Sequence, residues 1–283
     1  MTPLVDTHQH LVYREVAGYG WTAGIPALAD KEFPLEKYRE LAGEPSVAAT
    51  IFMETGVDDE DYQAEARFVA GLAGQPSSRM VGLIASCRPE TDEGYEAWLD
   101  ECADLNVVGY RRILHVMPDD LSQSETFRRN IREIGRRDLV FDMCFLSSQL
   151  PIAVELAKAA DNTRLVLNHC GVPDIAGGGL DPWRAQMAEL AALPNVNCKL
   201  SGLLAYCVPG EASLEAIRPY VDHVLETFGA DRIVWGSDWP VVDMANGLPD
   251  WLTVTGAILD GLSEDEAARI ARDNAVRIYK VDP

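Results

Sequence analysis

The sequence predicts an α/β protein folded as a single (β/α)8 TIM barrel over residues 1–283, and three observations lead to this expectation. The length of 283 residues is close to the roughly 250 residues typical of this barrel. Short apolar runs rich in β-branched residues recur eight times along the chain. Segments with helical periodicity follow most of these runs, and this alternation is typical of a parallel sheet.

The eight expected strands are short and apolar, and they cover residues 4–7, 48–53, 80–85, 107–110, 139–145, 164–168, 196–200 and 233–236. Apolar residues at helical spacing cover residues 59–72, 92–105, 125–136, 150–160, 182–193 and 214–228. An open doubly wound sheet would more often carry a glycine-rich phosphate turn after its first strand. Gly18, Gly20 and Gly24 lack that spacing. The pattern therefore favours a closed barrel.

Two segments interrupt the rhythm of strand and helix. Residues 11–44 form a long stretch with Trp21 and several glycines and prolines. This stretch is either a loop that covers the active-site end of the barrel or an irregular packing segment with a short helix over residues 34–41. Near the other end, Ser263 precedes three acidic residues, which predicts an N-cap and a terminal helix that runs to Tyr279.

The net charge of the chain limits the classes of partner that it can bind. Lys and Arg total 24 against 45 Asp and Glu, which gives a formal charge of −21. Such a surface repels a phosphate backbone and anionic lipid, so we expect neither nucleic acid nor membrane as a partner. A small-molecule substrate is compatible with this charge because a few inward-facing arginines set the field inside a pocket. Whether the chain forms a homo-oligomer is left open.

Cysteine usage and the first residues indicate the cellular compartment. The six cysteines form no Cys-x-x-Cys pair and no dense framework, so we expect reduced thiols. No basic segment with an apolar stretch precedes the first strand, and no apolar run approaches about 18 residues. The sequence therefore predicts a cytoplasmic protein.

The first expected strand ends in a cluster of polar residues, Asp6, His8 and His10. Side chains alternate along a strand, so these three are expected to share one face. A satisfied core histidine is the structural alternative, but two imidazoles beside a carboxylate fit a metal or acid/base site better.

Other polar residues end the second and fourth strands, where the reacting groups of a barrel lie. Glu54 closes an apolar strand and is either a metal ligand or a solvated strand end. Of Arg111 and Arg112, only one can face the barrel axis; the inward one should bind a carboxylate or polarise a carbonyl, and the outward one should pair with helix acids. His115, one step further, is interpreted as a loop residue able to contact substrate.

The sixth and eighth strands end in His169 and Asp238. Cys170 points away from its neighbour His169, so a buried thiol is favoured over a nucleophile. Asp238 lies between two tryptophans and a proline, where partial desolvation can raise its pKa and suit it to act as a general base. Trp21 and Trp239 are the candidates for stacking against a sugar ring.

Five motifs in order carry a family resemblance: DTHQH at 6–10, GYRR at 109–112, NHCGVP at 168–173, CKLSGL at 198–203 and WGSDWP at 235–240. Together they resemble the amidohydrolase superfamily, and within it the amidohydrolase-2 type lactonases, which include L-fuconolactonases, rhamnonolactonases and pyrone-dicarboxylate lactonases. The resemblance implies hydrolysis of a cyclic ester, with Asp238 as the base toward water and His8, His10 and His169 orienting or polarising the ester. It also assigns the family's strand-four arginine to Arg111.

The cofactor expectation is at most one divalent ion. The potential ligands for zinc or manganese are His8, His10, Glu54, His169 and Asp238. Many superfamily members add a histidine at the end of strand five, but residues 141–145 contain none. Some lactonases of this group look metal-independent, so an enzyme without metal is an alternative.

Two other functions compete with a lactonase acting on a sugar-acid or muconate-type lactone. A metal-dependent decarboxylase of the same superfamily shares His8, His10, His169 and Asp238, but it generally needs a tighter metal site than this strand five offers. A non-catalytic barrel that binds a ligand predicts substitutions at the motif positions, and here each is filled by a reactive residue.

Overall fold

Eight parallel strands form one sheet in the computed structural model, which describes residues 3–43, 46–75 and 77–283. The strands are β1 Leu4–Gln9, β2 Val47–Met53, β3 Met80–Ser86, β4 Val107–Ile113, β5 Val140–Cys144, β6 Arg164–Leu167, β7 Val196–Leu200 and β8 Ile233–Trp235. Each strand pairs with the next along the chain, and all pairs are parallel. The eight expected strands are confirmed, and only their ends differ.

The sheet closes where β1 meets the segment that follows β8. The Thr7 hydroxyl donates to the carbonyl of Trp235 at 2.7 Å, and the Asp238 N–H donates to the carbonyl of His8 at 2.9 Å. The N–H of His10 donates to the carbonyl of Trp239 at 2.8 Å. These bonds satisfy both edges of the sheet and complete the predicted barrel.

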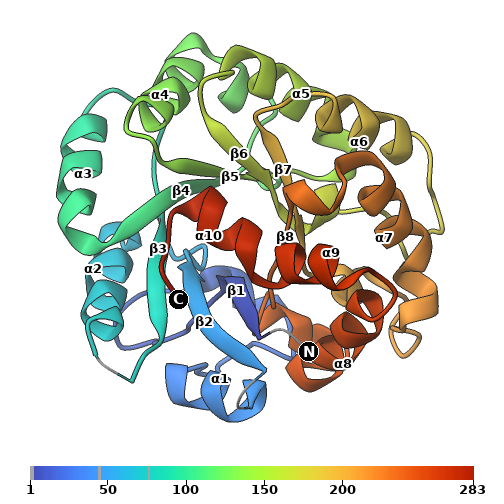
Figure 1. Cartoon of the computed structure of the whole chain (residues 1–283). Coiled ribbons are helices and arrows are strands. Elements are labelled where there is room, and N and C mark those ends of the chain that lie inside the picture. Colours follow the sequence, from blue (N-terminus) through green and yellow to red (C-terminus); the bar gives the residue numbers. More distant parts are fainter. Residues whose placement is uncertain (1–2, 44–45, 76) are drawn as a thin grey trace.

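Helices surround the strands as an outer ring (Figure 1). They are α1 Leu35–Ala42, α2 Tyr62–Ala73, α3 Tyr95–Cys102, α4 Glu125–Arg136, α5 Leu150–Ala159, α6 Trp183–Ala191, α7 Leu214–Phe228 and α8 Leu248–Leu259. All helices expected from periodicity are present, and the short helix expected over 34–41 is α1. Glu44, the last residue of the irregular stretch 11–44, lies outside the described residues.

The last helical segment closes one end of the barrel. It consists of α9 Glu264–Ala268, a π-helical turn Arg269–Asp273 and α10 Asn274–Tyr279. Ser263 caps α9 in a capping box with Glu266, as its sequence predicts. Figure 1 shows α10 lying across the barrel, where Ile278 is buried with Ile51 and Val140. With this end closed, the carboxyl ends of the strands form the open end of the barrel.

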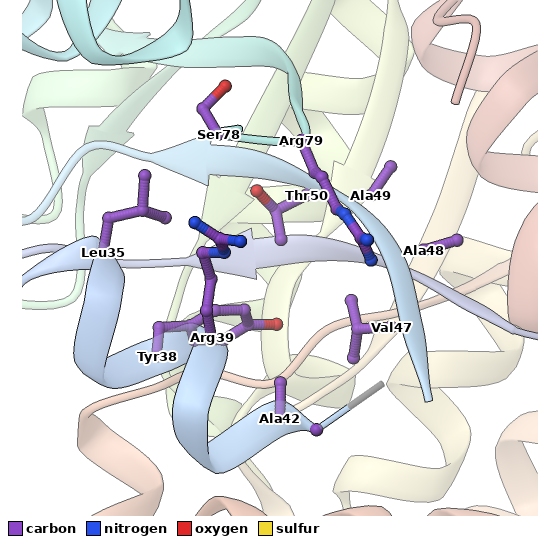
Figure 2. A pocket seen from close by; sticks show the side chains of 11 residues that line it. Leu35, Tyr38, Arg39, Ala42, Val47, Ala48, Ala49, Thr50, Ser78 and Arg79 are labelled. Carbon is purple, nitrogen blue, oxygen red and sulfur yellow. The ribbon is translucent and has the colours of Figure 1, made fainter. Parts of the chain in front are cut away.

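The remaining space between strands and helices is filled by apolar side chains. All six cysteines are buried and free, which agrees with reduced thiols. Among the described residues, no helix has both the length and the apolar composition that a membrane crossing requires. A small hollow between α1 and β2, lined by Tyr38, Arg39 and Thr50 among others (Figure 2), has a volume of about 30 Å³. That is room for roughly one water molecule, so this hollow is no ligand site.

Candidate active site

A cavity of about 520 Å³ lies at the carboxyl ends of the strands. Pockets for small molecules are typically about 300 to 1,000 Å³, so this volume suits a single sugar-sized ring. The predicted site residues that line it are Trp21, Glu54, Arg111, His115, His169, Asp238 and His10. His8 lies directly behind the wall and is fully buried.

Asp238 is the centre of a group of charged and imidazole side chains. Its Oδ1 lies 3.6 Å from His8 Nε2 and 3.5 Å from His10 Nε2, and its Oδ2 lies 3.8 Å from His169 Nδ1. Burial raises the pKa of Asp238, while the charges of neighbouring groups, Arg111 among them, oppose that rise. Its backbone φ of +57° is in the left-handed region, which is uncommon for a residue with a side chain. The loop after β8 therefore holds this carboxylate in a constrained position.

The three histidines around Asp238 are neutral. Burial lowers the pKa of His10 to about 3 and that of His169 to about 4, and it holds the pKa of His8 well below the usual range. His10 Nδ1 lies 2.9 Å from the carbonyl oxygen of Met53. A carbonyl can only accept, so Nδ1 carries the proton and Nε2, which faces Asp238, has a free lone pair.

Arg111 faces the barrel axis, which settles the choice between the two adjacent arginines. Its Nε donates to Glu54 Oε1 at 2.5 Å, its Nη2 donates to the Glu54 carbonyl, and its Nη1 lies 3.3 Å from His8 Nε2. Burial raises the pKa of Glu54, but the charge and hydrogen bonds of Arg111 outweigh this and lower it overall. Glu54 is thus an ionised partner of Arg111, and two N–H groups of the guanidinium are left for a ligand.

Arg112 differs from its expected position. We expected it to point outward and pair with helix acids, but it lines the mouth of the cavity. Its partners are Glu90, at 2.6 Å, and Asp59, at 3.7 Å, and both belong to loops that follow strands. The reason is that β4 reaches Ile113, so Arg112 lies near the strand end, where neighbouring loops lean over the barrel.

Three residues have donor atoms placed to share one metal ion: His8, His10 and Asp238, whose atoms lie within 4.8 Å of one another. Neutral imidazoles and a carboxylate suit zinc or manganese, and Asp238 Oδ2 makes no hydrogen bond. Arg111 competes for His8 Nε2. Of the other two predicted ligands, Glu54 is held by Arg111, and His169 contacts Ser201 Oγ at 2.9 Å through Nδ1, so the full ligand set stays a prediction.

Asp6 and Trp239 are corrections to the sequence analysis. The carboxylate of Asp6 accepts from the Tyr38 hydroxyl at 2.6 Å and from the N–H of Ser237 at 2.8 Å, so it supports the loop that carries Asp238. The strand pairing is irregular between Asp6 and Gln9, which is why simple alternation fails there. Trp239 is fully buried against Phe33 and does not line the cavity.

Two predicted substrate contacts do lie in the wall of the cavity. His115 Nδ1 is 3.1 Å from Cys144 Sγ. Trp21, which belongs to the irregular stretch after β1, donates from Nε1 to the Thr55 carbonyl at 2.9 Å. The N–H of Gly18, from the same stretch, donates to Asp61. The stretch therefore covers part of the cavity and also packs on the loop that follows β2, so each of the two interpretations describes part of it.

Gly202 is a site residue that sequence reasoning missed. A Cβ there would lie 2.7 Å from His169 Nδ1 and 2.8 Å from Asp238 Oδ2, and φ is +71°. Only glycine leaves room for both groups at this position. Ser201 and Gly202 directly follow β7, so the rule that active residues lie at strand ends could have found them.

Comparisons with known proteins agree with this geometry. A family model described as amidohydrolase matches residues 5–281. The chain is 28% identical over 296 residues to an L-fucono-1,5-lactonase of Burkholderia ambifaria, covering 100% of this chain and 97% of that protein. It is 26% identical over 245 residues to a 4-sulfomuconolactone hydrolase of Rhizobium radiobacter, covering 83% and 75%.

A solved structure that resembles this chain contains zinc. It is an amidohydrolase from Burkholderia multivorans with bound zinc, 27% identical, with a TM-score of 0.87 over 99% of this chain and 100% of that one. The resemblance drawn from the five motifs is confirmed. The zinc of this relative and the group of His8, His10 and Asp238 support a divalent metal in this family.

Proposed function

This chain belongs to the amidohydrolase family, and on that premise we propose that it opens the ring of a small lactone by attack of water on the ester carbonyl. The observation that carries the proposal is the buried Asp238 carboxylate, surrounded by three neutral imidazoles and open to the cavity beside Arg111. Lactonases among the relatives support a sugar-acid or muconate-type ring as the substrate.

Asp238 is the proposed general base. Asp238 lines the cavity, and its carboxylate has a lone pair that no hydrogen bond within the protein occupies, so it can take a proton from a water molecule there. Burial raises its pKa and so increases its basicity, while the charges of neighbouring groups, Arg111 among them, oppose that rise. A positioned base of this kind contributes about 10² to 10⁴ in rate.

Arg111 is the proposed electrophile. Its two remaining N–H groups can donate to the lactone carbonyl oxygen, where negative charge develops as water adds. Its pair with Glu54 fixes the plane of the guanidinium, so little reorganisation is needed during the reaction. His10 and His169 are proposed to orient the ester, and His115 and Trp21 to contact the rest of the substrate.

The bond changes follow from these roles. Water loses a proton to Asp238 and forms a bond to the carbonyl carbon; the ring C–O bond then breaks, and the ring oxygen takes up that proton from Asp238, which restores the carboxylate. The product is a hydroxy acid that ionises at neutral pH. A divalent ion held by His8, His10 and Asp238 would polarise the carbonyl and lower the pKa of a bound water.

The test is acidification of a weakly buffered lactone library, followed with a pH indicator. We expect saturable acid release on at least one lactone and no carbon dioxide. Carbon dioxide from an unsaturated or aromatic acid, with no lactone opened, would support the decarboxylase instead. Saturable ligand binding without any turnover would support the non-catalytic barrel. A cytoplasmic location and the absence of nucleic-acid and membrane partners remain parts of this proposal.

A further inference from the structure

The mouth of the cavity carries positive charge that is already neutralised. Three arginines and three carboxylates line the cavity among the described residues: Arg88, Arg111, Arg112, Glu54, Asp59 and Asp238. Arg111 is paired with Glu54, as described above. Asp59 Oδ1 lies 2.7 Å from Arg88 Nη2 and 3.7 Å from Arg112 Nη1. Asp59 is thus the close ion-pair partner of Arg88, whereas the nearer partner of Arg112 is Glu90, at 2.6 Å.

Arg88 is also fixed in place. Its Nη1 donates to Ser86 Oγ at 2.8 Å and to the Cys87 carbonyl at 2.9 Å, and its guanidinium lies 4.2 Å from the centre of the Tyr62 ring. Its side chain is only 12% exposed, whereas that of Asp59 is 78% exposed. The cation is therefore part of the wall, while the carboxylate that neutralises it can be removed without opening a hole in the core.

The pairing of these arginines with carboxylates affects which ligands, charged or uncharged, bind in the cavity. A carboxylate on the substrate loses its hydration on entry and regains the energy only if a cation is free to pair with it. Here it would have to compete with Asp59 or Glu54 for arginines that already have partners. An uncharged lactone pays no such cost, because its hydroxyl groups need only hydrogen-bond partners.

We propose that the cavity selects an uncharged lactone over a carboxylated one, and that Asp59 sets this selectivity by neutralising Arg88. The inference rests on the proposed lactonase function where it is tested by kinetics. A second test measures ligand binding and needs no lactonase activity. Asp59 is a specificity residue that acts through Arg88; it takes no part in the chemistry.

The kinetic test compares aldonolactones with the matching aldaric acid monolactones, in which the terminal CH₂OH is replaced by a carboxylate. We expect the wild-type protein to have the higher kcat/KM on the uncharged member of each pair. In Asp59→Asn, kcat/KM on the carboxylated member should rise about threefold to tenfold, as a partly exposed charge pair allows, with little change on the uncharged one. The rise should shrink in 1 M salt, where the Debye length is only about 3 Å.

Two variants control this test. Asp100→Asn removes an exposed carboxylate that pairs with Arg137 at 2.6 Å outside the cavity, so it changes the net charge equally and should leave the selectivity unchanged. Asp59→Asn/Arg88→Gln removes the released cation and should lose most of the gain. If Asp59→Asn only distorted the loop, kcat/KM would change on both members of each lactone pair, and the change would not depend on salt.

Binding separates this inference from the proposed function. Calorimetry with tetrahydropyran polyols, with and without a carboxylate, needs no turnover. We expect the wild-type protein to bind the uncharged ring more tightly and Asp59→Asn to gain affinity for the charged ring. A protein that shows this binding but opens no lactone would overturn the lactonase and leave the selectivity standing. Wild-type preference for the charged ring, or an unchanged preference in Asp59→Asn, would overturn the inference.

Discussion

The two ends of the barrel interior bury charge in opposite ways. The floor network, made of Asp142, Asn168, Lys199 and Tyr279, lies below the cavity. Lys199 Nζ donates to Asp142 at 2.6 Å and to the Thr7 carbonyl at 2.8 Å, and Asn168 and Tyr279 also donate to Asp142. The cavity cluster, made of His8, His10, Arg111, His169 and Asp238, lies above it and leaves His8 Nδ1 and Asp238 Oδ2 without hydrogen bonds.

The two groups differ in how fully their charged side chains are paired and hydrogen-bonded. In the floor network the charges of Lys199 and Asp142 pair directly and each has further hydrogen-bond partners, so the one polar atom left without a partner is the uncharged Asn168 Oδ1. In the cavity cluster, lone pairs are left over, and the backbone is constrained as well, with φ of +54° at His169 and +48° at Val172. The floor network therefore stabilises the fold, whereas the cavity cluster gives up stability for chemistry.

Removing the base from the cavity cluster should have the largest effect. Asp238→Asn keeps the shape of the side chain, and we expect kcat to fall by about 10² to 10⁴ or more. The folded-state pKa of Asp238 is raised, so its stabilising contribution exists below the unfolded pKa and is lost as pH rises through the folded value. The variant should therefore melt at pH 7 no lower than the wild type. Turnover near the wild-type level would move the base to Glu54 or a histidine.

Breaking the floor network should cost stability of similar size. Lys199→Met leaves Asp142 buried without its cation, and we expect the free energy of unfolding, measured with urea, to fall by about 3 to 5 kcal/mol. Lys199→Met/Asp142→Leu should recover much of that loss, since no charge is left unpaired. Lys158→Met, which breaks an exposed pair with Glu155, is the matched control and should change stability by less than about 1 kcal/mol. A harmless Lys199→Met would refute the comparison.

Binding of a metal ion to the cavity cluster should change the stability of the fold by a smaller amount. We expect at most one divalent ion per chain, bound weakly because Arg111 competes for His8 Nε2. Zinc at about 100 times its Kd should stabilise the fold by about 2.7 kcal/mol. His10→Ala should abolish the resulting rise in Tm, and Lys199→Met, which leaves all three ligands in place, should keep it. Two ions retained per chain after chelation, by elemental analysis, would contradict this expectation.

The last effect is a pH dependence, and it concerns Glu65, a second buried acid near the cavity. Burial and the charge of Glu54 raise the pKa of Glu65 to about 8. The stability this gives is complete below the unfolded pKa near 4.5 and is lost as pH rises through about 8. Glu65→Gln should flatten the decline of Tm between pH 5 and pH 8. Glu155→Gln, on the surface, should leave the profile unchanged, and an equally steep decline in Glu65→Gln would refute the assignment.

The cavity cluster could be predicted from the sequence, whereas the floor network could not. The cavity cluster was found because its members end strands, and closure of a barrel brings strand ends together. The floor network was not found: Asp142 and Lys199 lie inside strands, where a charged residue carries no sign of its partner. Asp6 and Trp239 were misplaced because irregular pairing after Asp6 and dense packing at Trp239 depend on neighbours far away in the chain.

The sequence by itself determined the barrel, the order of its elements and the polar residues at its strand ends, because periodicity and strand-end position are local properties of the chain. Only the tertiary structure decided which groups pair. It placed Glu54 on Arg111 rather than on a metal, and Arg112 with Asp59 at the mouth of the cavity. Pairing depends on distances of a few ångströms between side chains from different strands and loops, and these distances exist only once the barrel has closed.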